Sequence, residues 1–409
     1  MSEFNQQQPL IMYIDLNSCF ASIEQQARPM LRGRPVAIVN RRTEKTAIVT
    51  ASYEAKAMGV KVGMKLADAK ILCPDIIGLE SDPAKYRHVY HQLLDIMQEY
   101  SAHVTMKSID EGVIDFHDAP ESIRSRDLVE IAHEIKHRLK TEIGVWMRCN
   151  VGISTNRFLA KTAASLHKPD GLDVITPKNV RAVLTHLQLT DLTGIAERNA
   201  HRLRSVGIMT PVQFLDADTV TLEKLVFQSV VGNWWYKRLH GWEVDDNESD
   251  VKRVGRQYVI ERHDLSYREI LQRLHHLCES VGSRLRSRHL AARGVYVYVK
   301  TKDRGYWHQT HLSTLPFSSN QTIYEIAEQL FRQAPTDIRE IGIHCYKLEV
   351  DAVSQVSLFE DQLARERRII KVIDDINDRF GERTVHSADT LGTGSYVHSK
   401  VPFGSTRYL

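Results

Sequence analysis

The sequence predicts an α+β protein of several domains, and three observations support this prediction. Its 409 residues exceed the length of one typical domain. Residues 10–175 alternate short apolar strands with amphipathic helices, whereas residues 176–245 show helical periodicity with short loops. Residues 256–350 then alternate in the order β-α-β-β-α-β, which is typical of a split βαβ domain. The acidic, non-periodic stretch 245–250 indicates a linker.

The expected elements follow from hydrophobic periodicity and from the turn residues between periodic segments. In the first part of the chain their order suits a sheet that carries acidic residues on one edge. The pattern predicts strands and helices as follows: a strand entering a helix over 10–24, short strands and a small helix over 33–75, a helix over 83–101, a strand pair over 103–116, a helix over 125–142, a strand over 146–153, a helix over 155–167, strands over 256–260, 295–299, 309–312 and 341–350, and helices over 266–290, 319–333 and 367–379.

Composition excludes several classes of protein. The five cysteines are scattered without a CxxC pair or a His/Cys cluster, which argues against a structural zinc and against a disulfide framework. The N-terminus lacks the basic and apolar regions of a signal peptide. No stretch approaches the ~20 apolar residues that a membrane span needs. We therefore expect a cytoplasmic protein without a membrane partner.

Two adjacent carboxylates, Asp110 and Glu111, lie in a short β-branched run that the pattern predicts to be a strand. Neighbouring side chains on a strand point to opposite faces, and an uncompensated buried carboxylate is very costly. A third carboxylate, Asp15, lies in a similar apolar run. If the two strands pair, the three acids meet in an oxygen-rich arrangement that suits Mg²⁺. Considered alone, such a pair more often marks a strand end or a turn.

The net charge of +3 is too small to indicate a nucleic-acid partner by itself. Residues 252–305, however, contain 13 Lys and Arg against five acids. Most charge runs are solvated faces, but a basic segment in the same chain as a metal-type site is typical of a surface that follows phosphates. The candidate DNA-binding side chains of this segment are Arg256, Arg284, Arg286, Lys300 and Lys302.

Four sequence blocks resemble the motifs of the Y-family (translesion) DNA polymerases. They are residues 15–24 (DLNSCFASIE), residues 47–56 followed by 59–61, residues 108–115 (SIDEGVID), and residues 152–156 followed by 160–161 and 168–171. The blocks occur in the family's order and spacing. The resemblance covers about residues 10–360 and is closest to the DNA polymerase IV type.

The resemblance implies a right-hand polymerase with palm, fingers, a helical thumb and a split-βαβ little finger. The implied boundaries are palm 10–25 and 76–175, fingers 26–75, thumb 176–245, linker 246–254, little finger 255–351, and a clamp-binding motif with a C-terminal tail over 352–409.

The resemblance also implies two-metal nucleotidyl transfer, in which carboxylates hold two Mg²⁺ ions at the reacting phosphate. Asp15 and Asp110 would bridge both ions, Glu111 would bind the ion that activates the primer 3′-OH, and the carbonyl of Leu16 would complete the ligand set. Asp115, four residues beyond Glu111, is expected to be structural or to support the ligands without binding the ions itself.

The incoming dNTP is expected to contact Thr50, Tyr53, Lys56 and Lys168. Lys56 is a departure, because the family has an arginine there and lysine offers a point charge instead of a bidentate fork. Val49 stands where the family has a small residue over the nascent pair. Phe20 occupies the position of the steric gate that selects dNTP over rNTP, although a lone phenylalanine is more commonly a core residue.

Two short motifs imply macromolecular partners. Gly194 and Ile195 lie in a segment that resembles a helix-hairpin-helix, whose glycine turn points backbone N–H groups at a DNA phosphate. The family usually has a second glycine where Ala196 stands, so the turn is expected to be looser; the alternative is an ordinary αα-hairpin. Residues 355–359 resemble the bacterial sliding-clamp pentapeptide, in which Gln355, Leu358 and Phe359 fill an apolar cleft. Residues 360–409 follow it, a placement closer to the catalytic subunit of DNA polymerase V.

We therefore expect a template-directed DNA polymerase of the low-fidelity bypass class, in the bacterial cytoplasm at the nucleoid, with primer-template DNA, dNTP and a sliding clamp as partners. One alternative is a catalytically silent scaffold that recruits other polymerases to the clamp, which need not keep the three acids. A second is a palm-type nucleotide cyclase, which needs neither the basic segment nor the helix-hairpin-helix.

Overall fold

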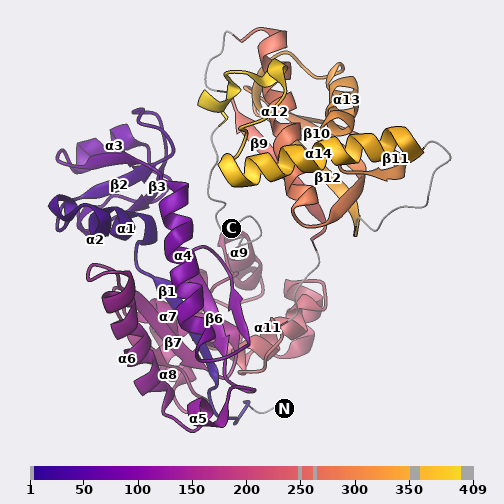
Figure 1. The fold of residues 1–409 in the computed structure, drawn as a ribbon. Helices are drawn as coiled ribbons and strands as arrows, with labels where there is room; N and C mark the ends of the chain where they lie inside the picture. The colour runs from indigo at the N-terminus through magenta and orange to yellow at the C-terminus, as the bar shows by residue number, and fades with distance from the viewer. Residues whose placement is uncertain (1–3, 247–250, 261–264, 351–359, 398–409) are drawn as a thin grey trace. The chain divides into compact units, whose positions relative to one another are not determined.

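The computed structural model describes residues 4–246, 251–260, 265–350 and 360–397 (Figure 1). The chain divides into two compact units, the first ending at Asn247 and the second comprising Glu248–Ser399. None of the helices in these described ranges has the length and hydropathy needed to span a bilayer. All five cysteines are buried and free.

The first unit is built on a five-stranded sheet in the order β5-β6-β1-β7-β8. β1 lies between β6 and β7 and is antiparallel to both (Figure 1), while β8 is parallel to β7. The predicted strand pairing of the acid-bearing segments is therefore confirmed. The strands are β1 (Ile11–Leu16), β5 (Val104–Met106), β6 (Glu111–Asp115), β7 (Cys149–Ser154) and β8 (Leu172–Val174).

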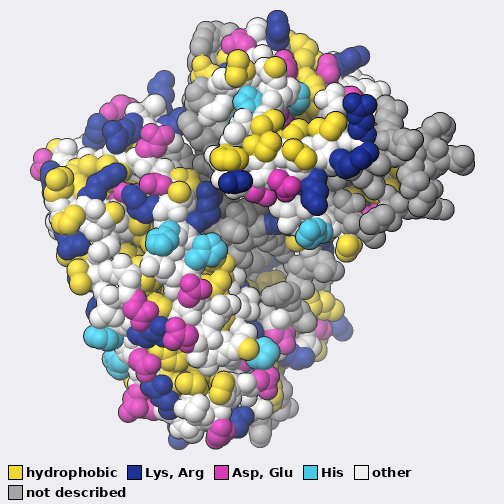
Figure 2. All heavy atoms as spheres, in the orientation of Figure 1, with side chains coloured by type: hydrophobic (Ala, Val, Ile, Leu, Met, Phe, Trp, Pro, Cys, Tyr) yellow, Lys and Arg dark blue, Asp and Glu magenta, His cyan; other side chains and the backbone are white. Residues whose placement is uncertain are grey.

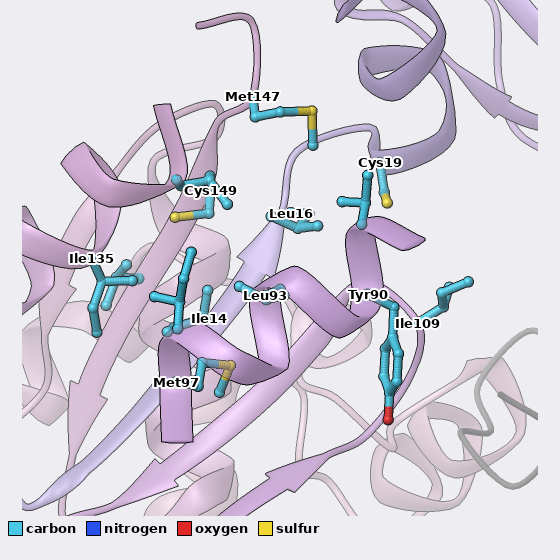
Figure 3. Packing of buried hydrophobic residues seen from close by; sticks show 14 of the residues in the cluster. Ile14, Leu16, Cys19, Tyr90, Leu93, Met97, Ile109, Ile135, Met147 and Cys149 are labelled. Atoms are coloured by element: carbon cyan, nitrogen blue, oxygen red, sulfur yellow. The ribbon is translucent and has the colours of Figure 1, made fainter. Parts of the chain in front are cut away.

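The two faces of β1 pack against different helices because its side chains alternate. Met12, Ile14 and Leu16 join the core formed with α4 (Pro83–Gln98) and α6 (Leu128–Arg138). Figure 3 shows Leu93 and Met97 of α4 close to Ile14 in this core.

The opposite face of β1 packs against α7 (Arg157–Leu166), where Ile11 and Tyr13 contact Ala160 and Ala164. Gly152 permits this close packing, because a Cβ there would lie 2.0 Å from the carbonyl oxygen of Ala160. Asp15 continues the series of Ile11 and Tyr13 and therefore lies on the α7 side of the sheet.

A smaller three-stranded sheet, in the order β3-β2-β4, has its own apolar cluster. α1 leads from β1 toward this part of the chain and packs against α4. The elements are α1 (Cys19–Ala27), η1 (Pro29–Leu31), β2 (Val36–Val39), β3 (Ile48–Ala51), α2 (Tyr53–Ala57), α3 (Leu66–Leu72) and β4 (Ile77–Glu80), while α5 (Glu121–Arg124) and η2 (Leu139–Ile143) flank α6.

The rest of the first unit is helical, as predicted for residues 176–245. Phe214, Phe227 and Trp235 lie at its centre, with Phe214 and Trp235 ring centroids 5.6 Å apart. The elements are α8 (Val180–Thr185), η3 (Leu189–Asp191), α9 (Glu197–Ser205), α10 (Pro211–Asp216), η4 (Thr221–Val226) and α11 (Val231–Leu239).

The second unit confirms the predicted β-α-β-β-α-β order and forms an antiparallel sheet, β11-β10-β12-β9. Val295, Val297 and Val299 of β10 are fully buried on the side of the sheet that packs against α12 and α13. The elements are β9 (Arg253–Val259), α12 (Tyr267–Arg286), β10 (Leu290–Thr301), β11 (Tyr306–Phe317), α13 (Asn320–Phe331) and β12 (Ile338–Val350).

The C-terminal segment of the second unit is more ordered than the sequence pattern indicated. α14 (Glu360–Phe380) is longer than the helix expected over 367–379 and is followed by the turns η5 (Ala388–Thr390) and η6 (Thr393–Ser395), which pack against α12. The outer face of α14 carries exposed apolar side chains, including Ile369, Val372 and Phe380, and Figure 2 shows a row of hydrophobic side chains over this helix.

Candidate active site

The three predicted acids lie at one end of the central strands. Asp15 of β1 and Glu111 of β6 are direct partners in the antiparallel register. The N–H of Leu16 donates to the carbonyl of Asp110 at 2.8 Å, which joins the two segments beyond the last paired residues. Asp110 itself precedes β6, and its carboxylate accepts a 2.5 Å hydrogen bond from the Ser108 hydroxyl. The prediction that both carboxylates lie inside a strand is therefore wrong by one residue: Asp110 ends a turn and Glu111 begins the strand.

Two lysines contact these acids. Lys168 donates to Asp15 at 2.5 Å, and Lys161 of α7 donates to Glu111 at 2.7 Å and to the Tyr13 hydroxyl at 3.1 Å. Burial raises the pKa of Asp15, while Lys168 opposes that rise. The sequence interpretation placed Lys161 in a motif but gave it no role.

The acids also repel one another. Burial raises the pKa of Asp110, and the charges of Asp15 and Glu111 raise it further. Among the residues that the structure describes, no group of three or more His, Cys, Asp or Glu side chains is placed so that it could hold a metal ion. The donor set nevertheless fits Mg²⁺ chemically, because three half-buried, mutually repelling carboxylates offer only oxygen ligands and gain from a shared cation.

A buried pair of amides positions the loop that carries Lys168. Asn17 donates to the side-chain oxygen of Asn150 at 2.9 Å and accepts from the N–H of Asp170 at 2.7 Å. Asn150 in turn donates to the carbonyl of His167 at 3.0 Å. The segment 167–170 is therefore fixed on both sides of Lys168. Sequence reasoning missed this pair, although Asn150 was a visible signal as a polar residue in an apolar strand.

A second group of side chains forms a cationic region beside Asp15. Lys56 of α2 donates to the Ser18 hydroxyl at 2.8 Å and lies 4.7 Å from the centre of the Tyr53 ring. Burial lowers the pKa of Lys56, and the charge of Lys168 lowers it further. Burial raises the pKa of Tyr53 to about 12, against the opposing charge of Arg148. The arrangement suits a polyanion, and sequence reasoning missed both Ser18 and Arg148.

The remaining predicted nucleotide contacts lie nearby in the chain. Thr50 is half-buried on β3, just before α2, and Val49 packs against the core of the larger sheet. Phe20 is only 3% exposed on α1, and its ring stacks on that of Tyr86.

The glycine turn before α9 has the expected backbone. Gly194 has φ +95°, a conformation that side chains rarely adopt, and a Cβ there would lie 3.1 Å from the Trp235 ring. Ile195 is buried, and its N–H donates to the carbonyl of Leu192 at 2.9 Å. Neither the side chain nor the N–H of Ile195 is thus offered to a phosphate. Ala196 is the N-cap of α9.

All three arginines predicted to bind DNA make contacts within the second unit. Arg256 donates to Ser280 at 2.6 Å and has a side chain only 8% exposed, and Arg284 donates to the carbonyl of Gly255 at 3.0 Å. Arg286 makes a bidentate pair with Asp374 of α14, at 2.6 and 2.7 Å. The structure gives these residues a packing role that local charge counting did not anticipate.

Lys300 and Lys302 remain accessible. Their side chains are 38% and 42% exposed and pair with Glu340 and Asp337 at 2.8 and 3.0 Å. The pair of Lys302 with Asp337 is exposed on both sides and therefore weak, so a phosphate can replace that carboxylate. Glu340, in contrast, is only 5% exposed and also accepts from the Tyr298 hydroxyl at 3.0 Å. The clamp-type motif with Gln355, Leu358 and Phe359 lies outside the described residues.

Two family models match this chain, one in each compact unit. Residues 14–165 match the model of the impB/mucB/samB family, and residues 251–358 match the model of the C-terminal domain of that family. DNA polymerase IV of Pelotomaculum thermopropionicum is 32% identical, covering 93% of this chain and 95% of its own. DNA polymerase IV 1 of Bacillus subtilis is 30% identical, covering 93% of both chains. This chain belongs to the Y-family DNA polymerases, of the polymerase IV type.

A solved structure supports the same fold. The Y-family polymerase chimera Dbh-Dpo4(243-245)-Dbh is 23% identical, matches with a TM-score of 0.72, and aligns over 83% of this chain and 99% of its own. The chain therefore has the predicted right-hand polymerase fold. As a Y-family member it is a DNA-directed DNA polymerase of the translesion class that uses divalent metal ions, and the comparisons give no support to a catalytically silent scaffold.

Proposed function

We propose that this polymerase adds dNMP to a primer 3′-OH through Asp15, Asp110 and Glu111, which would hold two Mg²⁺ ions. The observation that carries the proposal is the register of β1 and β6, which sets Asp15 opposite Glu111 beside the turn that bears Asp110. When bound, two such ions supply Lewis acidity to both the attacking and the leaving oxygen. The carbonyl of Leu16 is the proposed main-chain ligand.

The cationic region beside the acids is the proposed dNTP site. Lys56 and Lys168 lie close enough for one charge to lower the pKa of the other, and a triphosphate relieves such repulsion. Tyr53 and Thr50 are the proposed hydroxyl donors. Lys168 also contacts Asp15 at 2.5 Å, so the same side chain links the phosphate site to the acids. Phe20 is the proposed steric gate beneath the sugar.

The proposed domain boundaries are those implied by the sequence motifs, and DNA contacts are proposed separately for the thumb and for the little finger. Gly194 supports a backbone contact to DNA, and the exposed Lys300 and Lys302 support contacts with phosphates. The proposed clamp contact uses residues 355–359. The named relatives are bacterial, so we place this activity at the nucleoid of a bacterial cell.

The metal assignment is tested by primer extension with isosteric variants. Asp110→Asn and Glu111→Gln should lower the rate by about a thousandfold or more, since metal polarisation contributes several kcal/mol to the transition state. Asp115→Asn is the matched control, because this carboxylate of the same strand contacts His117 at 2.6 Å and Arg157 at 3.5 Å. Fluorescence anisotropy with labelled primer-template should show unchanged DNA binding for all three variants. Extension by Glu111→Gln at the parental rate would exclude the assignment.

The clamp assignment has its own test. Replacing Leu358 and Phe359 with alanine should reduce extension in the presence of the sliding clamp to the rate measured without it. The double substitution of Ile369 and Val372 to serine, on the exposed face of α14, is the matched control for the loss of apolar surface. Clamp stimulation that survives in the first variant would show that the pentapeptide is not the contact.

A further inference from the structure

A buried contact between α1 and α4 lies directly behind the proposed steric gate. Phe20 and Glu24 are four residues apart on α1 and therefore share a face of that helix. Tyr86 of α4 meets both of them. Its ring stacks on the Phe20 ring at a centroid distance of 4.2 Å and an interplanar angle of 7°, and its hydroxyl donates to Glu24 at 3.2 Å.

Glu24 is a fixed anchor. The residue is 1% exposed, and both carboxylate oxygens accept hydrogen bonds of 2.9 Å from the ammonium of Lys85. Arg28, one turn further along α1, pairs with the same carboxylate at 3.2 Å. A buried carboxylate with this many donors does not move without leaving charges unpaired, which is strongly unfavourable. The position of the Tyr86 hydroxyl is fixed accordingly.

Tyr86 is thus held at both ends of its side chain. It is fully buried, so the plane of its ring is set by the core around it and by the bond to Glu24. The Phe20 ring lies against that plane at van der Waals distance and has no space to move back on this side. A steric gate discriminates only if the ring cannot move away from a 2′-hydroxyl.

We propose that Tyr86, anchored by Glu24, is a positioning residue for sugar selection, because it forms the rigid wall that keeps Phe20 in place against a ribonucleotide. The inference rests on the proposed role of Phe20 as the gate. Neither Tyr86 nor Glu24 touches the nucleotide in this proposal. Their effect on selectivity is transmitted through the stacked ring.

The test is the ratio of kcat/KM for a dNTP to that for the matching rNTP, measured by single-nucleotide insertion. Tyr86→Leu removes the flat wall and should lower the ratio about tenfold, mainly by raising kcat/KM for the rNTP. Tyr86→Met keeps most of the volume but is flexible, so it should lower the ratio in the same direction. Tyr86→Phe keeps the ring but removes the hydroxyl that Glu24 holds, so it should lower the ratio in the same direction and by less than Tyr86→Leu.

A matched control comes from the same core. Tyr100 is also buried, and its hydroxyl donates to Glu134 at 2.6 Å. Tyr100→Leu therefore deletes a buried tyrosine ring with a hydrogen bond to a carboxylate away from the gate, although Glu134 is more exposed than Glu24, and it should leave the ratio unchanged. Thermal melting of every variant separates loss of folding from loss of selectivity, and Tyr86→Met provides the measurement if Tyr86→Leu does not fold.

The possible outcomes distinguish the role of Tyr86 from the proposed role of Phe20 as the steric gate. If Phe20→Ala destroys discrimination while Tyr86→Leu and Tyr86→Met keep the parental ratio, the wall has no role and the gate assignment stands. If Phe20→Ala itself keeps the ratio, the gate assignment fails. Equal losses of dNTP and rNTP insertion in the Tyr86 variants would show a purely structural role and would overturn the inference.

Discussion

The buried His276 should make the stability of the second unit depend on pH, in addition to His344, whose pKa burial lowers to about 4. His276 of α12 is 1% exposed, and its Nδ1 lies 2.8 Å from the Thr393 hydroxyl of the C-terminal segment. Burial, with the nearby charges of Arg383 and Arg256, lowers its pKa from 6.5 to about 3. The unfolded chain therefore binds a proton that the folded unit does not bind between these two pH values.

The direction and size of the change in unfolding free energy follow from this difference in bound protons. As the pH falls below 6.5, protonation favours the unfolded state, so the free energy of unfolding decreases. At pH 5 the solution is about 1.5 units below the unfolded pKa, which corresponds to a loss of about 2 kcal/mol relative to neutral pH. The stabilisation is fully present above pH 6.5, and the loss continues down to about pH 3.

Hydrogen exchange of the α12 amides, resolved by mass spectrometry in the full chain, is the measurement. The parent and His276→Gln are compared at pH 7.5 and pH 5, so that intrinsic exchange rates cancel between the two proteins. The opening free energy of α12 should fall by about 2 kcal/mol more in the parent than in His276→Gln. His311→Gln, at an exposed position on β11, should behave like the parent. The same pH dependence in the parent and in His276→Gln would refute the reasoning.

Three further outcomes are expected. Arg286→Ala should destabilise the second unit by about 2–3 kcal/mol in denaturant unfolding, because it leaves the half-buried Asp374 without its bidentate partner, and the salt dependence of DNA binding should stay parental. Gly194→Ala should cost about 1–2 kcal/mol, since its φ of +95° is unfavourable for a side chain, and a melting curve identical to the parent's would contradict this. Lys168→Ala should raise the KM for dNTP about tenfold or more in single-nucleotide insertion, through loss of a charge-assisted phosphate contact; an unchanged KM would remove Lys168 from the nucleotide site.

The secondary structure was largely predictable because its signals are local. The apolar run from Ile11 to Leu16 indicated a strand, and the apolar spacing over 83–101 indicated the helix now seen as α4. The β-α-β-β-α-β order was read from the same periodicities. The turns η5 and η6 after α14 were not predicted, because they depend on contacts with α12 and not on a repeating apolar pattern.

The sequence singled out the three acids of the candidate site but not the residues that position them. Asp15, Asp110 and Glu111 were visible as carboxylates in apolar runs, where their cost demands a partner. The buried pair of Asn17 and Asn150 was not predicted, because the two residues are 133 positions apart and neither forms a motif alone.

The amino-acid sequence by itself determined the family, the order of strands and helices, and which acids and lysines are candidates for the site. Only the tertiary structure decided which of these charges pair with one another inside the fold. Arg286 belongs to a basic segment in the sequence, yet its partner is Asp374, 88 positions away on another helix. A charge interacts strongly only with groups within a few ångströms, and packing between distant segments decides which groups those are.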